Sequence, residues 1–204
     1  LESNKSLGVN LDGMPGVTSP ADPSLDVGPN HVIQMINGTG GSTFKIWDKS
    51  GNVIQNSTIF DNFMNSASLN GNPGWGGAGD PIVIYDQRAD RWLLTEFSSS
   101  GNNLYVAVST AADPTGSYYT YTINMPSFPD YPKYSVWENE YVITANLGSS
   151  DIVALPRADM LAGVSTNAQK FTQANFGTIG FQASTPVNLD GTTIPPVGTP
   201  SMVM

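Results

Sequence analysis

The sequence predicts an all-β fold, namely a β-propeller built of four-stranded antiparallel blades. One phrase recurs, with an aspartate, a nearby proline, a short apolar stretch, a polar turn and a longer apolar run; it opens at Asp22, Asp80 and Asp130. The repeats are about 50 to 60 residues apart, a spacing typical of arrays whose units each hold several strands. Within them, apolar and polar residues alternate with the period of two expected for half-buried strands.

The second repeat gives the clearest blade. We expect its strands at residues 82–85, 92–97, 104–109 and 118–123. The segments between them are short and rich in Gly, Asn, Asp and Ser, which favour tight turns. Four strands joined by short turns make one propeller blade.

The first and third repeats follow the same scheme with insertions. Strands of the first are expected at residues 32–37, 43–48 and 53–54, and those of the third at 134–137, 141–145, 151–155 and 170–172. Helical turns are expected near 59–64 and 156–163. We expect no regular structure in the Gly-rich run 70–79, because glycine and proline punctuate it throughout.

The two ends of the sequence differ from the repeats. Residues 1–21 are rich in Gly and Pro and predict an extended lead-in to a propeller region at 22–204. A fourth repeat opens near Thr185 and reaches Met204 within an apolar strand, so we expect three blades plus the start of a fourth. Closed propellers have typically four to eight blades. We therefore expect a partner near Met204, either the remainder of the propeller or a second chain.

Composition restricts the function. Charged residues make up 12% of the chain, the formal net charge is −9, and there is no cysteine. The acidic balance opposes nucleic-acid binding, which relies on Lys and Arg at phosphates, and docking on anionic lipid. No run approaches the roughly 18 apolar residues of a membrane helix, so no membrane insertion is expected. The lack of cysteine fits an exported protein and excludes thiolate chemistry.

The repeats resemble a family of secreted bacterial β-propeller-like proteins that often carry C-terminal sorting, fibronectin-type or PKD modules. The resemblance covers nearly the whole chain from about Ala21. It rests on VGPNHVIQMIN (27–37), FKIWDKSG (44–51), GDPIVIYD (79–86), DRWLL (90–94), DPTGSYY (113–119) and FPDYPK (128–133). It implies a propeller fold and a secreted or cell-surface location, and it carries no catalytic residue to this chain.

The aspartates that open the repeats are the candidate metal ligands. The first strand of each propeller blade lines the central channel, so Asp22, Asp80 and Asp130 could form a carboxylate ring that binds Ca²⁺ through oxygen ligands. The alternative is local, since an aspartate next to a proline stabilises the turn that enters the strand. The sequence alone favours the local interpretation.

Three further residues are candidate ligand contacts. Trp75 lies in the Gly-rich insertion, where an aromatic ring could stack on a sugar; the alternative is a plug folded back over the blade. Tyr131 is a second candidate, with packing between blades as the alternative. His31, the one histidine, precedes a strand, and a structural role is the alternative. With one histidine, a three-histidine metal site is impossible.

Three functions remain open. The favoured one is an extracellular, non-catalytic binding or adhesion module, which binds a glycan with help from Ca²⁺. The second is a polysaccharide-active hydrolase or lyase with its site in the channel; Asp86, Asp90 and Glu96 could supply its carboxylates, although a hairpin turn with a surface ion pair explains the first two. The third is a structural subunit of a surface layer or fibre. No nucleophile elbow, zinc-protease, phosphate-loop or dinucleotide motif occurs.

Overall fold

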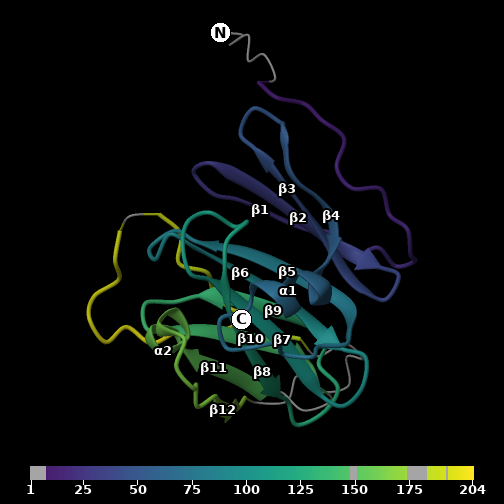
Figure 1. Cartoon of the computed structure of the whole chain (residues 1–204). Coiled ribbons are helices and arrows are strands. Elements are labelled where there is room, and N and C mark those ends of the chain that lie inside the picture. The colour runs from purple at the N-terminus through teal and green to yellow at the C-terminus, as the bar shows by residue number, and fades with distance from the viewer. Residues whose placement is uncertain (1–7, 148–150, 174–182, 192) are drawn as a thin grey trace, which may run out of the picture.

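The computed structural model describes residues 8–147, 151–173, 183–191 and 193–204. Its β-strands form three four-stranded antiparallel sheets, each of four strands consecutive in the chain (Figure 1). The prediction of an all-β fold with four-stranded antiparallel blades is therefore confirmed, and the arrangement is propeller-like without closing into a ring. We call the sheets blades 1, 2 and 3 in chain order.

Blade 1 is a meander with tight turns. Its strands are β1 (Ser24–Val27), β2 (His31–Gly38), β3 (Gly41–Asp48) and β4 (Val53–Ile59). The turn after β3 is fixed by the Asp48 carboxylate, which accepts the backbone N–H groups of Ser50 and Asn52, both at 2.8 Å. Gly51 in the same turn has a φ of 89°, a conformation that glycine adopts without a steric penalty.

Helix α1 (Phe60–Ala67) follows blade 1 and leads into blade 2. The strands of blade 2 are β5 (Gly77–Asp86), β6 (Arg91–Ser98), β7 (Asn103–Ser109) and β8 (Tyr118–Asn124). The β5–β6 turn is built on Asp86, whose Oδ1 accepts the backbone N–H groups of Arg88 and Ala89, both at 3.1 Å. This local capping is the turn chemistry that aspartate favours.

Blade 3 carries the second helix as an insertion. Its elements are β9 (Asp130–Val136), β10 (Glu140–Asn146), β11 (Asp151–Pro156), α2 (Arg157–Ala162) and β12 (Gln169–Thr172). Gly163 ends α2 with a φ of 72°, and its N–H turns back to the helix carbonyls. A left-handed glycine is the usual device for ending a helix.

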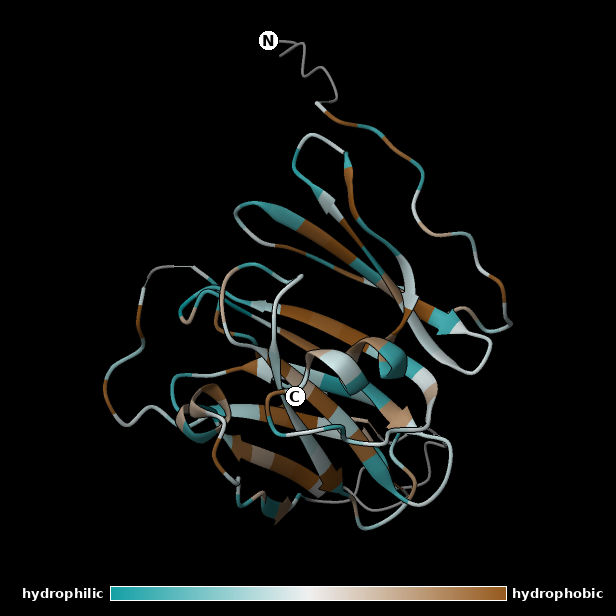
Figure 2. Ribbon diagram, viewed as in Figure 1, coloured by the Kyte–Doolittle hydropathy of each residue, from teal (hydrophilic) through white to brown (hydrophobic). Residues whose placement is uncertain are grey.

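Two apolar cores hold the blades together. One lies between blades 1 and 2 and includes Phe44, Leu94 and Trp92; the other lies between blades 2 and 3 and includes Leu93 and Tyr141. Successive residues of a strand point to opposite faces, so Leu93 and Leu94 serve different cores. The central strands of Figure 2 are accordingly coloured as apolar over much of their length.

A fourth unit begins beyond blade 3. Pro186 and Val203 form an antiparallel bridge, and the backbones of Thr185 and Met204 exchange hydrogen bonds of 2.7 and 3.0 Å. Leu189 N–H donates to Val136 O at 2.9 Å, which places this unit against β9. Over the described residues, no helix is long and apolar enough to cross a membrane.

Candidate functional site

A cavity of about 260 Å³ opens where the first strands of the three blades lie side by side. β1 contacts β5, and β5 contacts β9. The cavity is lined by Asp22, Pro23, Asp80, Pro81, Ile82, Tyr131, Pro132 and Lys133. Each blade thus contributes a residue followed by proline, and two of these three residues are acidic.

The backbone shows which positions of the three repeats are equivalent. The residues before the three prolines, Asp22, Asp80 and Tyr131, have φ values of 38°, 47° and 53°. Positive φ is uncommon outside glycine, more so for an aromatic residue than for aspartate, and such strain gathers at functional sites. Tyr131, not Asp130, therefore occupies the third equivalent position. The expected correspondence of Asp22, Asp80 and Asp130 is wrong by one residue, because the residue before proline sets the register.

Asn37, at the end of β2, joins the two acidic positions. Its Nδ2 donates to Asp22 Oδ2 at 2.7 Å and its Oδ1 accepts the Asp80 N–H at 2.8 Å. Asp80 Oδ2 in turn accepts the N–H of Tyr131 at 3.0 Å. These hydrogen bonds connect residues of all three blades in a continuous series. The side chains at the cavity are therefore held in fixed positions.

The charges of the cavity act on one another. Burial raises the pKa of Asp80; the Tyr131 N–H opposes this effect, and the charges of Asp22 and Asp130 add to it, leaving the pKa above its ordinary value. Burial also lowers the pKa of Lys133, against the pull of the Asp80 and Asp22 carboxylates. The site therefore holds a carboxyl group with a raised pKa beside a second carboxyl group and an amine.

Tyr131 presents an aromatic surface to the cavity. Its side chain is 48% exposed, and Lys133 Nζ lies 3.2 Å from the centre of its ring. A cation over an aromatic face is attracted by the ring quadrupole. The predicted ligand contact Tyr131 thus lies beside the two carboxyl groups, where a bound molecule would meet both.

Asp130 lies at the rim of this group. Its Oδ2 accepts a hydrogen bond from Asn146 Nδ2 at 3.2 Å, and it does not line the cavity. In the part of the chain that the structure describes, no three His, Cys, Asp or Glu side chains are grouped so that they could hold a metal ion. Asp130 thus stands apart from the cavity that Asp22 and Asp80 line, and Ca²⁺ binding by these three aspartates stays a prediction.

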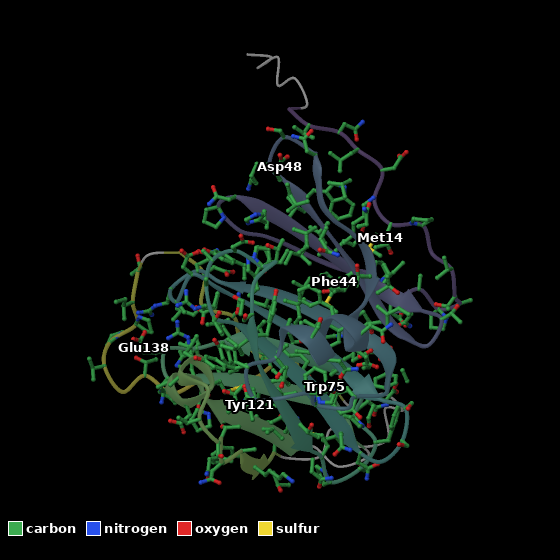
Figure 3. The ribbon with its side chains drawn as sticks, in the orientation of Figure 1. Met14, Phe44, Asp48, Trp75, Tyr121 and Glu138 are labelled. Atoms are coloured by element: carbon green, nitrogen blue, oxygen red, sulfur yellow. The ribbon has the colours of Figure 1, made fainter. Side chains whose placement is uncertain are left out.

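Trp75 lies in the core between blades 1 and 2. Trp75, labelled in Figure 3, is 7% exposed. It stacks on Tyr105 with ring centres 4.8 Å apart and donates from Nε1 to Thr122 Oγ1 at 3.0 Å. The ring is therefore engaged in packing between the Gly-rich insertion and blade 2. It does not line the cavity that contains Tyr131.

His31 lies at the opposite end of β2 from Asn37, away from the cavity. Its carbonyl accepts the N–H of Gly28 at 2.9 Å, which closes the β1–β2 turn. The other carboxylates considered from the sequence are also elsewhere: Asp86 and Asp90 belong to the β5–β6 turn, and Glu96 is buried between blades 1 and 2.

Sequence reasoning missed Asn37 and Lys133. Asn37 ends the apolar run of β2, and Asn146 ends that of β10 and also contacts an aspartate. The recurrence of an asparagine at the end of the second strand was the available signal. Lys133 follows a proline, as Ser24 and Ile82 do in the other blades, so its place at the cavity could be inferred from the repeat.

Comparisons with known proteins find similarity in fold. No family model and no curated protein matches the sequence. The chain is similar to a GH43 endo-arabinanase from Bacillus licheniformis, with a TM-score of 0.50 and 14% identity over 84% of this chain and 62% of the arabinanase. A native arabinanase of Bacillus subtilis gives 0.49 and 13% over the same shares. A GH43 β-1,3-galactosidase gives 0.43 and 14% over 72% of this chain and 34% of that one.

The neighbour with a TM-score of 0.50 is named as a GH43 endo-arabinanase. At this level of identity the likeness concerns the fold, and it agrees with the blade order found here. The chain spans 62% of the length of the arabinanases.

Proposed function

We propose that this chain forms part of an extracellular polysaccharide-active β-propeller, a glycoside hydrolase whose site is the cavity between Asp22, Asp80 and Tyr131. One observation carries the proposal: two carboxyl groups from neighbouring blades share a cavity with an exposed aromatic ring. Glycoside hydrolysis needs a protonated carboxyl group on one side of the sugar bond, and a carboxylate beside it helps to keep the proton there. An aromatic face offers a sugar ring a flat apolar surface.

Each residue has a role in this proposal. Asp80 donates the proton to the leaving oxygen, since its raised pKa favours the protonated form. Asp22 supplies negative charge beside it and is oriented by Asn37. Tyr131 positions the sugar. The carboxylate on the far side of the scissile bond would come from elsewhere around the propeller axis.

The fold supports the substrate class. The neighbour with a TM-score of 0.50 is an endo-arabinanase, so arabinan is the first polysaccharide to test, followed by galactan. Polymers of this kind lie outside cells, and an extracellular location agrees with a chain that has no cysteine.

The test measures release of reducing ends from arabinan and galactan by the full chain. We expect Asp80→Asn to lower the rate by about 100-fold or more, the usual contribution of an acid or base group, and Asp22→Asn to lower it by a smaller factor. Asp12→Asn, an exposed aspartate of the lead-in, is the matched control and keeps the rate. Equal rates for all three variants would contradict the proposal.

A second candidate function is glycan binding without hydrolysis. One observation favours it: Asp22 and Asp80 line the same small cavity and are linked through one residue, Asn37, whereas the carboxyl pair of a glycosidase stands roughly 5 Å or more apart, on either side of the sugar bond. In affinity electrophoresis with the same polysaccharides, Tyr131→Ala would then lose retention. Phe171→Ala, another exposed aromatic, would keep it. Retention without product release decides for this second function.

A further inference from the structure

Two carboxyl groups meet in the interior between blades 1 and 2, apart from the cavity. Asp61 comes from the first turn of α1 and Glu96 from β6, and their exposed fractions are 6% and 0%. Backbone groups fix one oxygen of each. Ser42 N–H donates to Glu96 Oε2 at 2.8 Å, and Gly77 N–H donates to Asp61 Oδ2 at 2.6 Å.

Two glycines make room for this carboxyl pair. A Cβ on Gly77 would lie 2.0 Å from both Cδ and Oε1 of Glu96. A Cβ on Gly41 would lie 3.4 Å from Asp61 Oδ2 and 3.6 Å from Glu96 Oε2. Both residues therefore border the same small space, one from blade 1 and one from blade 2.

The remaining oxygens of the cluster are buried without a partner. They are Asp61 Oδ1, Glu96 Oε1 and Ser42 Oγ. No base compensates the two acids, since the ion pairs of the described residues, Arg88 with Glu138 and Arg157 with Asp86, lie elsewhere. Keeping both of these adjacent carboxylates charged, away from water, would cost a large solvation free energy.

The other ionisable groups nearby leave the pair without a cation. Tyr105 of β7 lies opposite Glu96 in the strand register and stacks on Trp75. Asp80 of β5 lines the cavity between the first strands of the three blades. The ammonium group of Lys45, on β3, lies over the Trp47 ring, further along the strand than Ser42. Asp61 is the group whose charge acts on Glu96.

We infer that Asp61 and Glu96 share one proton between their otherwise unpartnered oxygens, and that this proton fastens α1 and blade 1 to blade 2. An O–H···O⁻ bond of this kind is short and strong. It satisfies Asp61 Oδ1 and Glu96 Oε1 together and removes one of the two buried charges. The Ser42 hydroxyl then donates to the same pair.

A metal ion is the competing way to neutralise the pair. Ca²⁺ takes six to eight oxygen ligands, and the cluster offers three side-chain oxygens without a partner. A proton needs two. The cluster therefore fits a proton better than Ca²⁺, and metal binding is an outcome that the test must separate.

The shared proton makes the blade 1–blade 2 contact dependent on pH. Burial raises the pKa of Glu96 well above its ordinary value, and the hydrogen bond and charge of Asp61 add to the effect. The folded state thus keeps a proton that the unfolded chain releases above the ordinary glutamate pKa of about 4.3. Stability from the pair is complete below that pH and falls as the pH rises toward the raised pKa.

The test compares urea unfolding of the full chain and of Glu96→Gln between pH 5 and 9. Glutamine keeps a neutral donor in place of the protonated acid. We expect the unfolding equilibrium constant of the native protein to rise by up to about tenfold per pH unit relative to Glu96→Gln, the slope for one proton. Glu140→Gln, a partly exposed glutamate at the start of β10, is the matched control and retains the native slope.

Two further measurements fix the interpretation. Infrared spectra of the native protein at neutral pH should show the carbonyl band of a protonated carboxylic acid, and this band should be absent from Glu96→Gln. If Glu96→Gln does not fold, Asp61→Asn takes its place in this comparison. Parallel pH slopes for the native protein and Glu96→Gln would overturn the inference. So would a melting temperature that rises with added CaCl₂ in the native protein alone, because a cation would then hold the pair.

Discussion

At the scale of single residues, a buried ion pair links blade 2 to blade 3. Arg157, the first residue of α2, donates from Nε to Asp86 Oδ2 at 2.6 Å and from Nη2 to Asp86 Oδ1 at 2.9 Å. The hydroxyl of Tyr141 donates to the same carboxylate at 2.9 Å. Burial alone would raise the pKa of Asp86, but the hydrogen bonds and charge of Arg157 outweigh it, and the pKa lies below its ordinary value.

Removing Arg157 should therefore leave a buried, uncompensated carboxylate. We expect Arg157→Ala to lower the free energy of unfolding by about 3–5 kcal/mol at neutral pH. A lowered pKa stabilises the fold above the unfolded value of Asp, and this stability is lost as the pH falls. The difference between the two proteins should accordingly shrink in acid, as urea unfolding at pH 7 and pH 3 would measure.

The control for this prediction is the second ion pair of the described residues. Arg88 pairs with Glu138, whose side chain is 45% exposed. Arg88→Ala should cost no more than about 1 kcal/mol, as is usual for surface pairs. Equal losses for the two arginine variants would show that burial does not set the strength of the Arg157 pair.

Trp92 belongs to the core between blades 1 and 2, where a Cβ on Gly28 of blade 1 would lie 2.8 Å from its ring. It is 1% exposed, its ring centre lies 4.9 Å from that of Tyr85, and its Nε1 donates to Ala112 O at 3.1 Å. We expect Trp92→Ala to lower the free energy of unfolding by about 3–5 kcal/mol, the range for a buried aromatic. Thermal melts measure the loss, and Phe171→Ala, which removes an exposed aromatic ring, should leave the melting temperature unchanged.

At the scale of elements, sequence patterns located most strands because each has one or two apolar faces. β6 and β7 follow the apolar runs at 92–97 and 104–109, and α1 and α2 fall where helical turns were expected. The burial of Trp75 by α1 and β7 was less predictable. It depends on contacts between segments distant in sequence, and a Gly-rich insertion has no periodicity that fixes its path.

Gly77, the first residue of β5, and Gly76 before it provide a test at this scale. A Cβ on Gly77 would lie 2.0 Å from Glu96, whereas one on Gly76 would meet Ser99 Oγ at an ordinary 3.5 Å. Gly77→Ala should overpack the blade 1–blade 2 boundary and cost about 1–3 kcal/mol or more. Gly76→Ala should be tolerated. Comparable denaturation midpoints for both variants would show that β5 shifts freely to relieve the contact.

At the scale of the whole molecule, the repeat predicted the blades better than it predicted the site. The spacing of the Asp-containing phrases was sufficient for three sheets in order, because each sheet is formed by consecutive strands. The site depends on finer detail. Asp130 and Tyr131 are neighbours in sequence, and only the backbone conformation shows that Tyr131 is the counterpart of Asp22 and Asp80. Asn37 and Lys133 are recognised as site residues only when the repeats are compared with one another, because the cavity lies between blades.

The fourth unit gives the last prediction. Residues 202–204 pair along one edge with 185–187, and no strand of the described ranges pairs with the other edge. The side chains of Met202 and Met204 are 49% and 80% exposed. An unpaired apolar edge tends to form hydrogen bonds with another strand. We therefore propose that polypeptide outside this sequence, or a second copy of the chain, completes the pairing.

The chain by itself should then associate as its concentration rises, and light scattering would measure this association. Met202→Lys with Met204→Lys should restore the monomer, because charges on an edge oppose pairing, whereas Val9→Lys in the lead-in should not. A monodisperse monomer with cooperative unfolding would instead mean that this edge is already satisfied within the chain.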